Sequence, residues 1–223
     1  MKPNALVKAI QSDFEAHLND EQAIGMKAYM KDQFDFLGIK KPERTELEKK
    51  FRPVFKSLAD EDWPLVIRQL WKLPFREYQY TAMELMRLRA KQLNAGHVPL
   101  LEFMIGTRTW WDTVDFIATN LAGELLRVHP DPRSELIEKW TVDDNFWFHR
   151  TCILFQLKYK SKTDKKLLFA LCARYADERE FFMRKAIGWA LREYGKHDPE
   201  SVRRFIAKQP LSGLSLREAS RYL

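Results

Sequence analysis

Apolar residues recur three and four positions apart through most of the chain, which is the spacing of amphipathic helices. In residues 109–127, one such stripe consists of Trp110, Val114, Ile117, Leu121 and Leu125. Strict alternation of apolar and polar residues is rare and the chain has only 8 glycines, so the signals for β-strands are weak. The pattern predicts an all-α fold of about a dozen helices, most of them about 10–18 residues long.

Proline and capping residues mark where several of these helices should begin. Pro42, Pro64, Pro132 and Pro199 stand where proline favours a first helical turn, and Asp131 and Asp198 precede two of them as candidate N-caps. Ser215 and Glu218 have the spacing of a capping box, which predicts that a terminal helix opens at Ser215.

The helical pattern also repeats along the chain with a period of 34 or 35 residues. Segment 147–153 superimposes on segment 181–187, and steps of 35 residues back from Arg150 reach Asp115 and Tyr80. Paired helices with such a period are typical of an α-solenoid, in which the second helix of each pair lines a concave surface. We therefore expect residues 1–223 to form one solenoid domain, with an irregular helical bundle as the alternative.

Composition excludes a disordered tail and an integral membrane protein. Hydrophobic residues make up 45% and charged residues 31% of the chain. The longest apolar run, Leu167–Ala173, is far shorter than the roughly 20 residues that span a bilayer. The first 20 residues contain no apolar stretch of a signal peptide, and Cys152 and Cys172 are predicted to be buried thiols in a reducing compartment. We expect a cytoplasmic protein.

The net charge of +7 is concentrated in the last third of the chain. Residues 145–223 hold 17 Lys and Arg against 8 Asp and Glu, whereas residues 1–144 have a net charge of −2. A basic surface of this kind attracts phosphate groups, although a solvated surface that binds nothing has the same composition.

Three predicted helices carry residues, nearly all aromatic or charged, on a side away from their apolar stripes. These residues are Trp111 and Asp115 in the first helix, Trp147, Arg150, Leu154 and Lys158 in the second, and Lys185, Trp189 and Arg192 in the third. The repeat register would bring Trp111 and Trp189 to one groove lined by cations, where Asp115 is either a solvated carboxylate or a partner of Arg150. The tryptophans predicted to lie in the core are Trp63, Trp71, Trp110 and Trp140.

Two indole rings and one carboxylate in a cationic groove fit one reaction on DNA. Lys and Arg side chains bind the phosphate backbone, and indole faces attract a purine that is positively charged after alkylation at N3 or N7. Such a base leaves without a general acid, and a single carboxylate stabilises the cationic sugar and orients water. Neutral glycosides usually need a second carboxylate.

Other catalytic classes find no support in the sequence. The 5 histidines are scattered without the spacing of metal ligands, and neither a glycine-rich phosphate loop nor a nucleophile elbow is present. No lysine stands out as a Schiff-base former. We expect neither a metal nor a cofactor.

A more specific signal comes from stretches that together span nearly the whole chain. They are Tyr29–Lys31, Phe36–Ile39, Pro42–Arg44, Trp110–Asp115, Arg150 with Ile153–Lys160, and Lys185–Tyr194. In this order they resemble the AlkD-type DNA alkylation repair glycosylases. The resemblance implies a solenoid of HEAT-like repeats that excises N3- and N7-alkylated purines from duplex DNA without a metal.

The resemblance also implies roles for individual residues. Asp115 matches the catalytic aspartate, Trp111 and Trp189 match the tryptophans that flank the damaged nucleotide, and Arg150 matches an arginine near its backbone. Residues expected to contact DNA in the groove are Tyr29, Lys158 and Arg192 from the resemblance, and Lys185 from its helix face. Recognition from the backbone side implies little dependence on the base beyond its positive charge.

The alternative to a monofunctional glycosylase is a non-catalytic helical scaffold that binds DNA or a protein partner. Both functions predict salt-sensitive binding to DNA. We expect a monomer, because a groove that wraps a duplex needs one chain only.

Overall fold

Two compact units make up the computed structural model, which describes residues 2–223. One unit ends at Gln92 and the other spans Leu93–Leu223. Within the described residues the only β-type pairing is an isolated parallel bridge between Asp35 and Phe75, so the all-α prediction is confirmed. In residues 2–223, no helix has both the length and the apolar character that crossing a membrane requires.

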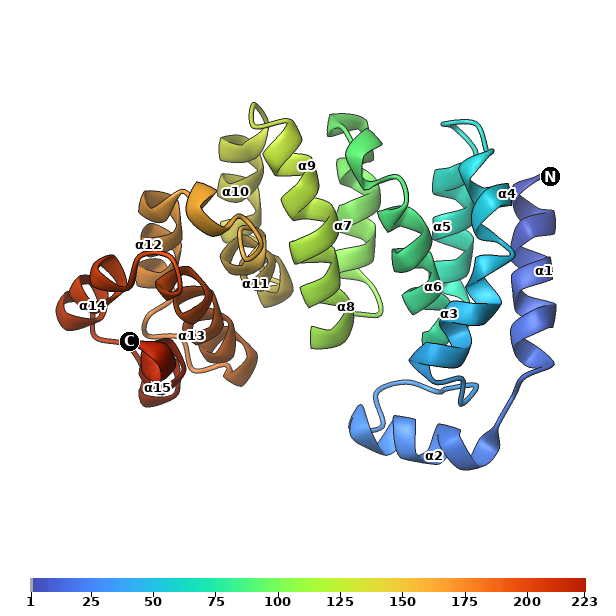
Figure 1. Cartoon of the computed structure of the whole chain (residues 1–223), viewed down its shortest axis with the longest axis horizontal. Helices are drawn as coiled ribbons and strands as arrows, with labels where there is room; N and C mark the ends of the chain where they lie inside the picture. Colours follow the sequence, from blue (N-terminus) through green and yellow to red (C-terminus); the bar gives the residue numbers. More distant parts are fainter. Residues whose placement is uncertain (1) are drawn as a thin grey trace. The chain divides into compact units, whose positions relative to one another are not determined.

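The first unit contains helices α1 to α6 and a short 3₁₀ turn (Figure 1). Their bounds are α1 Pro3–Glu15, α2 Asp20–Tyr29, α3 Lys41–Lys49, α4 Arg52–Lys56, α5 Trp63–Lys72, α6 Arg76–Arg87 and η1 Ala90–Gln92. α5 packs between α1 and α6, and its Trp63 and Trp71 are each 1% exposed, as predicted for core residues. α2 runs crosswise to α1 and buries none of its residues (Figure 1).

A buried carboxylate fastens the segment between α2 and α3. Glu77 of α6 is fully buried, and its oxygens accept hydrogen bonds from the backbone N–H groups of Leu37, Gly38 and Ile39 at 2.9–3.1 Å. Gly38 has a φ of +87°, which glycine adopts without strain, and a Cβ there would lie 2.0 Å from the carbonyl oxygen of Asn19. Glu77 and Gly38 therefore fix this segment together.

The second unit contains helices α7 to α15 (Figure 1). Their bounds are α7 Val98–Gly106, α8 Trp111–Phe116, α9 Gly123–Val128, α10 Arg133–Thr141, α11 Phe146–Leu154, α12 Lys165–Arg174, α13 Phe181–Gly195, α14 Pro199–Lys208 and α15 Gly213–Ala219. The shorter elements are η2 Ala95–His97, η3 Ile117–Ala122, η4 Lys160–Lys162 and η5 Ser220–Tyr222. α11 packs against α8, α10, α12 and α13, and α13 also packs against α14 and α15.

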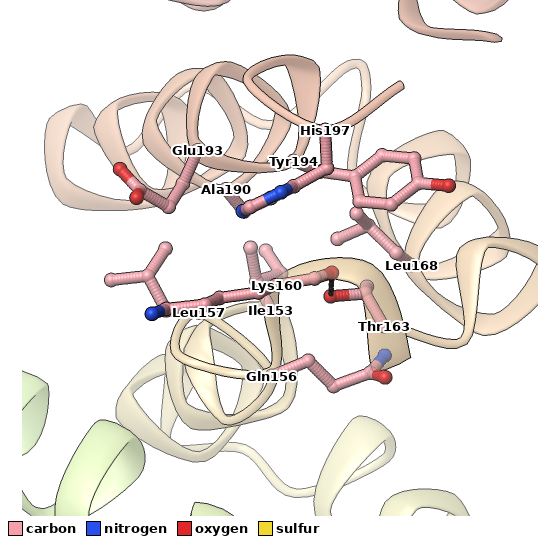
Figure 2. Close-up of a pocket in the computed structure, with 10 residues that line it drawn as sticks. All are labelled: Ile153, Gln156, Leu157, Lys160, Thr163, Leu168, Ala190, Glu193, Tyr194 and His197. Carbon is pink, nitrogen blue, oxygen red and sulfur yellow. Dashed lines mark hydrogen bonds between the residues drawn. The ribbon is translucent and has the colours of Figure 1, made fainter.

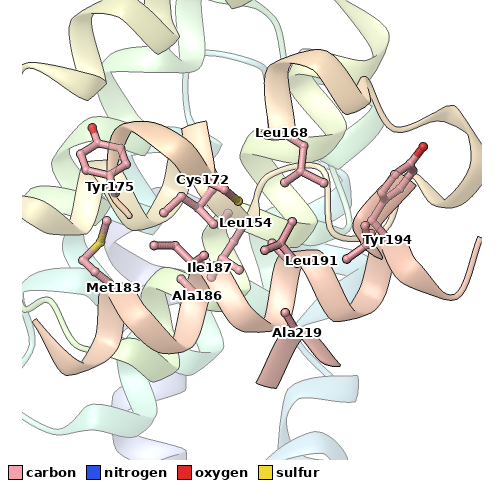
Figure 3. Packing of buried hydrophobic residues seen from close by; sticks show 14 residues of the cluster. Leu154, Leu168, Cys172, Tyr175, Met183, Ala186, Ile187, Leu191, Tyr194 and Ala219 are labelled. Atoms are coloured by element: carbon pink, nitrogen blue, oxygen red, sulfur yellow. The ribbon is translucent and has the colours of Figure 1, made fainter. Parts of the chain in front are cut away.

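An apolar core joins α11, α12 and α13. Figure 3 shows Leu154, Leu168 and Cys172 facing Ile187 and Leu191 of α13, and all five are at most 3% exposed. Each fully buried Leu or Ile contributes about 1.5–3 kcal/mol to folding, so this cluster fixes where α13 lies. Both cysteines are free and buried, as predicted, and burial raises the pKa of each thiol above its ordinary value.

Most predicted helix starts are confirmed, and two are wrong. Pro42, Pro64 and Pro199 lie in the first turns of α3, α5 and α14, and Asp198 caps α14 by accepting a hydrogen bond from the Ser201 backbone N–H at 3.0 Å. Asp131 caps nothing, because α10 begins after Pro132, which itself occupies the N-cap position without a side-chain hydrogen bond.

The predicted capping box at the terminal helix is also wrong. Ser212 is the N-cap of α15 and accepts a hydrogen bond from the Ser215 backbone N–H at 3.2 Å. Ser215 itself is buried, and its hydroxyl donates to the backbone carbonyl of Arg184 at 3.1 Å. Glu218 is thereby left to interact with α13 instead of with its own helix.

The helix predicted over residues 109–127 is continuous from Trp111 to Val128, but its middle is π-helical. Side chains supply hydrogen bonds to backbone carbonyls just before this segment. The Thr119 hydroxyl donates to the carbonyl of Asp115 at 2.7 Å, and the Asn120 amide donates to that of Phe116 at 2.9 Å. Such π-turns are frequent at functional sites, and this one begins two residues after Asp115.

Hydrogen bonds in the second unit recur at close to the predicted repeat period. Arg150 bonds to Asp115 over 35 residues, Tyr159 to Gly123 over 36, and Tyr175 to Thr141 over 34. Helices one period apart in sequence are therefore in contact within this unit.

Candidate functional site

A pocket of about 340 Å³ lies among α8, α11, α13 and α15 of the second unit. Its lining residues are Trp111, Asp115, Arg150, Phe181, Phe182, Lys185, Trp189, Arg192 and Glu218. The volume is at the lower end of the range typical of small-molecule pockets, and the lining combines aromatic rings with a few charged groups. Six of the eight predicted site residues are brought together here.

The centre of the pocket is an ion pair between Asp115 and Arg150. The Arg150 Nε donates to Asp115 Oδ1 at 2.7 Å, and Nη2 donates to Oδ2 at 2.8 Å, so the pair is bidentate. The third nitrogen, Nη1, donates to the backbone carbonyl of Phe182. The Arg150 side chain is 5% exposed and that of Asp115 is 17% exposed, so the carboxylate is the member of the pair that still meets the pocket.

Burial raises the pKa of the Asp115 carboxyl above its ordinary value. The hydrogen bonds and positive charge of Arg150 act in the opposite direction and favour the ionised form. Asp115 is thus a partly desolvated carboxylate. The guanidinium of Arg150 fixes its orientation and stabilises its negative charge.

Arg150 is buried between helices, and its expected place near a DNA phosphate stays a prediction. The spacing of residues in α11 puts Trp147, Arg150 and Leu154 on a different side from its apolar stripe, whereas all three are buried. α11 packs between α8 and α13, so both of its sides are covered. With its nitrogens bonded to Asp115 and Phe182, Arg150 orients the carboxylate.

Aromatic side chains support this arrangement. Trp110, Trp147 and Phe182 form a cluster with ring centroids 5.1–5.9 Å apart, which fixes the backbone at Phe182. Trp110, predicted to be core, is partly exposed, because it precedes the first turn of α8. Trp111 is the first residue of α8 and Trp189 lies in the middle of α13, and both are partly exposed in the pocket lining.

The cations of α13 share one partner from α15. Glu218 Oε1 accepts a hydrogen bond from Lys185 Nζ at 2.9 Å, and Oε2 accepts one from Arg192 Nη1 at 2.6 Å. As predicted, Lys185, Trp189 and Arg192 share one side of α13, and this side lines the pocket. The Trp189 ring also packs against the edge of the apolar core.

The other two predicted DNA contacts are not in the pocket lining. Lys158 is exposed and its Nζ donates to Asn120 Oδ1 at 2.5 Å. Tyr29 belongs to the first unit, where it is the last residue of α2 and is 71% exposed.

Three residues that line the pocket were not predicted as site residues, namely Phe181, Phe182 and Glu218. The signal for Glu218 was Gly188, an isolated glycine inside a helix. A Cβ on Gly188 would lie 2.4 Å from Glu218 Cβ and 2.9 Å from the Ser215 carbonyl oxygen, so only glycine lets α15 approach this closely.

A second cavity lies between α11, η4 and α13 and has a volume of about 10 Å³. Figure 2 shows Glu193, Tyr194 and His197 on one side of it and Ile153, Leu157 and Gln156 on the other. A cavity of this size holds about one water molecule. It has no room for a nucleotide.

A family model and a solved structure point to the same family. Residues 10–223 match the family model described as DNA alkylation repair enzyme. A solved structure described as a predicted DNA alkylation repair enzyme from Enterococcus faecalis is 33% identical with a TM-score of 0.87, over 92% of this chain and 96% of that one.

A second solved structure, smu.31 from Streptococcus mutans UA159, shares the fold at 14% identity. Its TM-score is 0.62, and the match covers 81% of this chain and 97% of that one. No curated protein matches the chain. The family model spans most of the sequence and the Enterococcus structure is similar over nearly its full length, so this chain belongs to the DNA alkylation repair enzyme family.

Proposed function

We propose that the chain is a monofunctional DNA glycosylase that hydrolyses the N-glycosidic bond of positively charged N3- and N7-alkylated purines in duplex DNA. The observation that carries the proposal is the partly buried Asp115 carboxylate, held bidentately by Arg150 in a pocket that Trp111 and Trp189 also line. Membership of the DNA alkylation repair enzyme family supports a DNA substrate.

The pocket's chemistry suits a leaving group that is already cationic. As the bond between C1′ and the purine nitrogen breaks, the base takes the electron pair and departs neutral, and positive charge moves to the sugar. A fixed carboxylate stabilises that charge because it needs no reorganisation at the moment of reaction. Water, oriented by Asp115, then forms a bond to C1′ and releases its proton to the solvent.

The two tryptophans would hold the damaged nucleotide against the carboxylate. Indole faces attract a cationic purine, by about 0.5–2 kcal/mol depending on how far the pair is removed from water. Lys185 and Arg192 would contact the phosphates on either side of it, and Lys158 and Tyr29 are the other proposed contacts with DNA.

We further infer that the helices of the second unit stack as HEAT-like repeats whose inner helices face DNA. Hydrogen bonds at separations of 34–36 residues support this arrangement, since stacked repeats contact their neighbours in this way. That residues 1–223 form one solenoid domain, and that the chain acts as a monomer, stay predictions.

The test is incubation with duplex DNA that carries N7-methylguanine, with free base and abasic sites scored separately. Asp115→Asn should lower the single-turnover rate of base release by on the order of 100- to 1,000-fold, while binding to the same duplex is retained. Thermal unfolding of both proteins controls for loss of fold. Binding without base release by the unchanged protein would favour the scaffold function instead.

Substrate choice gives a second test in the same assay. Release of N7-methylguanine should far exceed release of uracil, because uracil is neutral and leaves only with acid assistance. Equal rates for the two bases would contradict the proposal that positive charge is what the pocket selects.

A further inference from the structure

The pocket holds a second carboxylate, Glu218, whose presence is unexpected in a surface proposed to bind DNA. Its side chain is 16% exposed and lines the same pocket as Asp115. A negative charge here repels the phosphate backbone, so the residue needs a reason other than contact with DNA. Nothing in its own helix occupies it, because Ser212 caps α15.

Glu218 bridges two cations that flank Trp189 on α13. Lys185 lies four residues before Trp189 and Arg192 three residues after it, so all three side chains share one helix face. One carboxylate oxygen accepts from Lys185 at 2.9 Å and the other from Arg192 at 2.6 Å. The bridge therefore spans the helix turn that carries the indole.

The carboxylate is itself held rigidly by the contact between α13 and α15. The Ser215 hydroxyl donates to the Arg184 carbonyl, and Gly188 lets the Glu218 Cβ approach the α13 backbone. The position of Glu218 is thus set by the backbones of two helices and not by the flexible cations that it bonds.

We propose that Glu218 is a positioning residue of the glycosylase site, which holds Lys185 and Arg192 beside Trp189 so that the indole keeps its place opposite Asp115. This inference rests on the proposed function. Its physical basis is that long cationic side chains lose much conformational freedom when ordered, and a fixed carboxylate orders both before DNA arrives.

The proposal predicts opposite effects on excision and on binding. Glu218→Ala should lower the single-turnover excision rate of N7-methylguanine by about 10-fold, because a slightly misplaced nucleotide reacts slowly. The same variant should bind undamaged duplex more tightly at low salt. Its plot of log affinity against log salt should become steeper by about 1, because the single negative charge that partly neutralises Lys185 and Arg192 is removed and both meet the phosphates with their full charge.

Two variants make the test specific. Glu218→Gln keeps the shape and one accepting oxygen, so its excision rate should fall between those of the unchanged protein and Glu218→Ala. Glu193→Gln removes the same charge from α13, where Glu193 pairs with Lys196 at 2.7 Å outside this pocket. It should leave the excision rate unchanged.

The outcomes separate this inference from the proposed function. An unchanged protein that excises nothing contradicts the proposed function, and the salt slopes then still test whether Glu218 restrains the two cations. If Glu218→Ala excises at the unchanged rate, the inference is wrong. If excision, affinity and melting temperature all fall together, Glu218 serves the fold alone and the inference is equally wrong.

Discussion

Glu77 in the first unit and Asp115 in the second are both carboxylates removed from water, and burial raises the pKa of each. Their partners differ. Glu77 is fully buried and accepts from three backbone N–H groups, whereas Asp115 accepts from one guanidinium and is still 17% exposed in a pocket. The first carboxylate has its hydrogen bonds satisfied by the fold, and the second keeps a surface for a substrate.

The comparison shows that a buried charge with a raised pKa does not by itself mark a site. Perturbed carboxylates are enriched at functional sites, but those that organise backbone are perturbed for the same reason. What distinguishes Asp115 is the adjoining cavity and the aromatic residues around it. Four substitutions, two of them with a control variant, test this distinction, from the largest expected effect to the smallest.

Arg150→Ala should damage both the fold and the chemistry. Breaking a buried ion pair by removing one partner costs about 3–5 kcal/mol of stability. Without the opposing effect of Arg150 the pKa of Asp115 rises further, so the active ionised form is lost at a higher pH as the solution is acidified. The acid limb of the excision rate should therefore move to higher pH, which a single-turnover pH profile measures.

Arg150→Lys serves as the matched control for this prediction, since it keeps the charge and loses the fork of donors. Its acid limb should lie between those of the unchanged protein and Arg150→Ala. An acid limb at the same pH in all three proteins would mean that Asp115 is not the group whose ionisation limits the reaction.

Glu77→Gln should affect stability alone. An amide replaces one accepting oxygen by a donor that faces the N–H groups of Leu37, Gly38 or Ile39, at a cost of about 3 kcal/mol in the free energy of unfolding. Denaturant unfolding measures the loss. A shift in the acid limb of excision would contradict the assignment of Glu77 to the fold.

Gly188→Ala should have a smaller effect, on both stability and the excision rate. The added methyl group meets Glu218 Cβ and the Ser215 carbonyl, so α15 must move, at a cost of about 2 kcal/mol. We expect a lower melting temperature together with a reduced excision rate. Gly25→Ala is the control, because a Cβ at that position meets nothing within 4 Å beyond its chain neighbours and the backbone of its own helix.

Lys196→Ala should change almost nothing. Lys196 pairs with Glu193 at 2.7 Å on the exposed side of α13, and its side chain is 48% exposed. Exposed pairs of this kind contribute about 0.2–1 kcal/mol or less to stability. A large loss of stability or of excision would show that the charges of α13 act as one network. Lys196 could then no longer be distinguished in function from the pocket cations Lys185 and Arg192.

The sequence determined the helical fold, because apolar residues at helical spacing form one stripe along a helix, and that stripe must be covered by whatever the helix packs against. It also determined which side of α13 carries Lys185, Trp189 and Arg192, since helix geometry fixes residues three and four apart on one face. The sequence left Asp115 either as a solvated carboxylate or as a partner of Arg150, and their ion pair at a separation of 35 residues confirms the second option.

Helix-face reasoning failed where a helix has neighbours on two sides. The spacing of residues in α11 puts Trp147 and Arg150 on a different side from its apolar stripe, but α8 and α13 cover both sides, and local spacing contains no information about a second neighbour. The sequence also did not predict the π-turn after Asp115. Side chains such as Thr119, whose hydroxyl donates to the Asp115 carbonyl, occur in α-helices and π-helices alike.

Only the tertiary structure decided how the charges of the pocket are paired. The spacing of Ser215 and Glu218 satisfies the rule for a capping box, yet Glu218 bonds to Lys185 and Arg192, because Gly188 allows two helix backbones to meet. A side chain chooses among partners by distance in space, and the distance between α13 and α15 is set by packing that no single stretch of sequence encodes. The residue types of the site can thus be read from the chain, whereas their ion pairs belong to the fold.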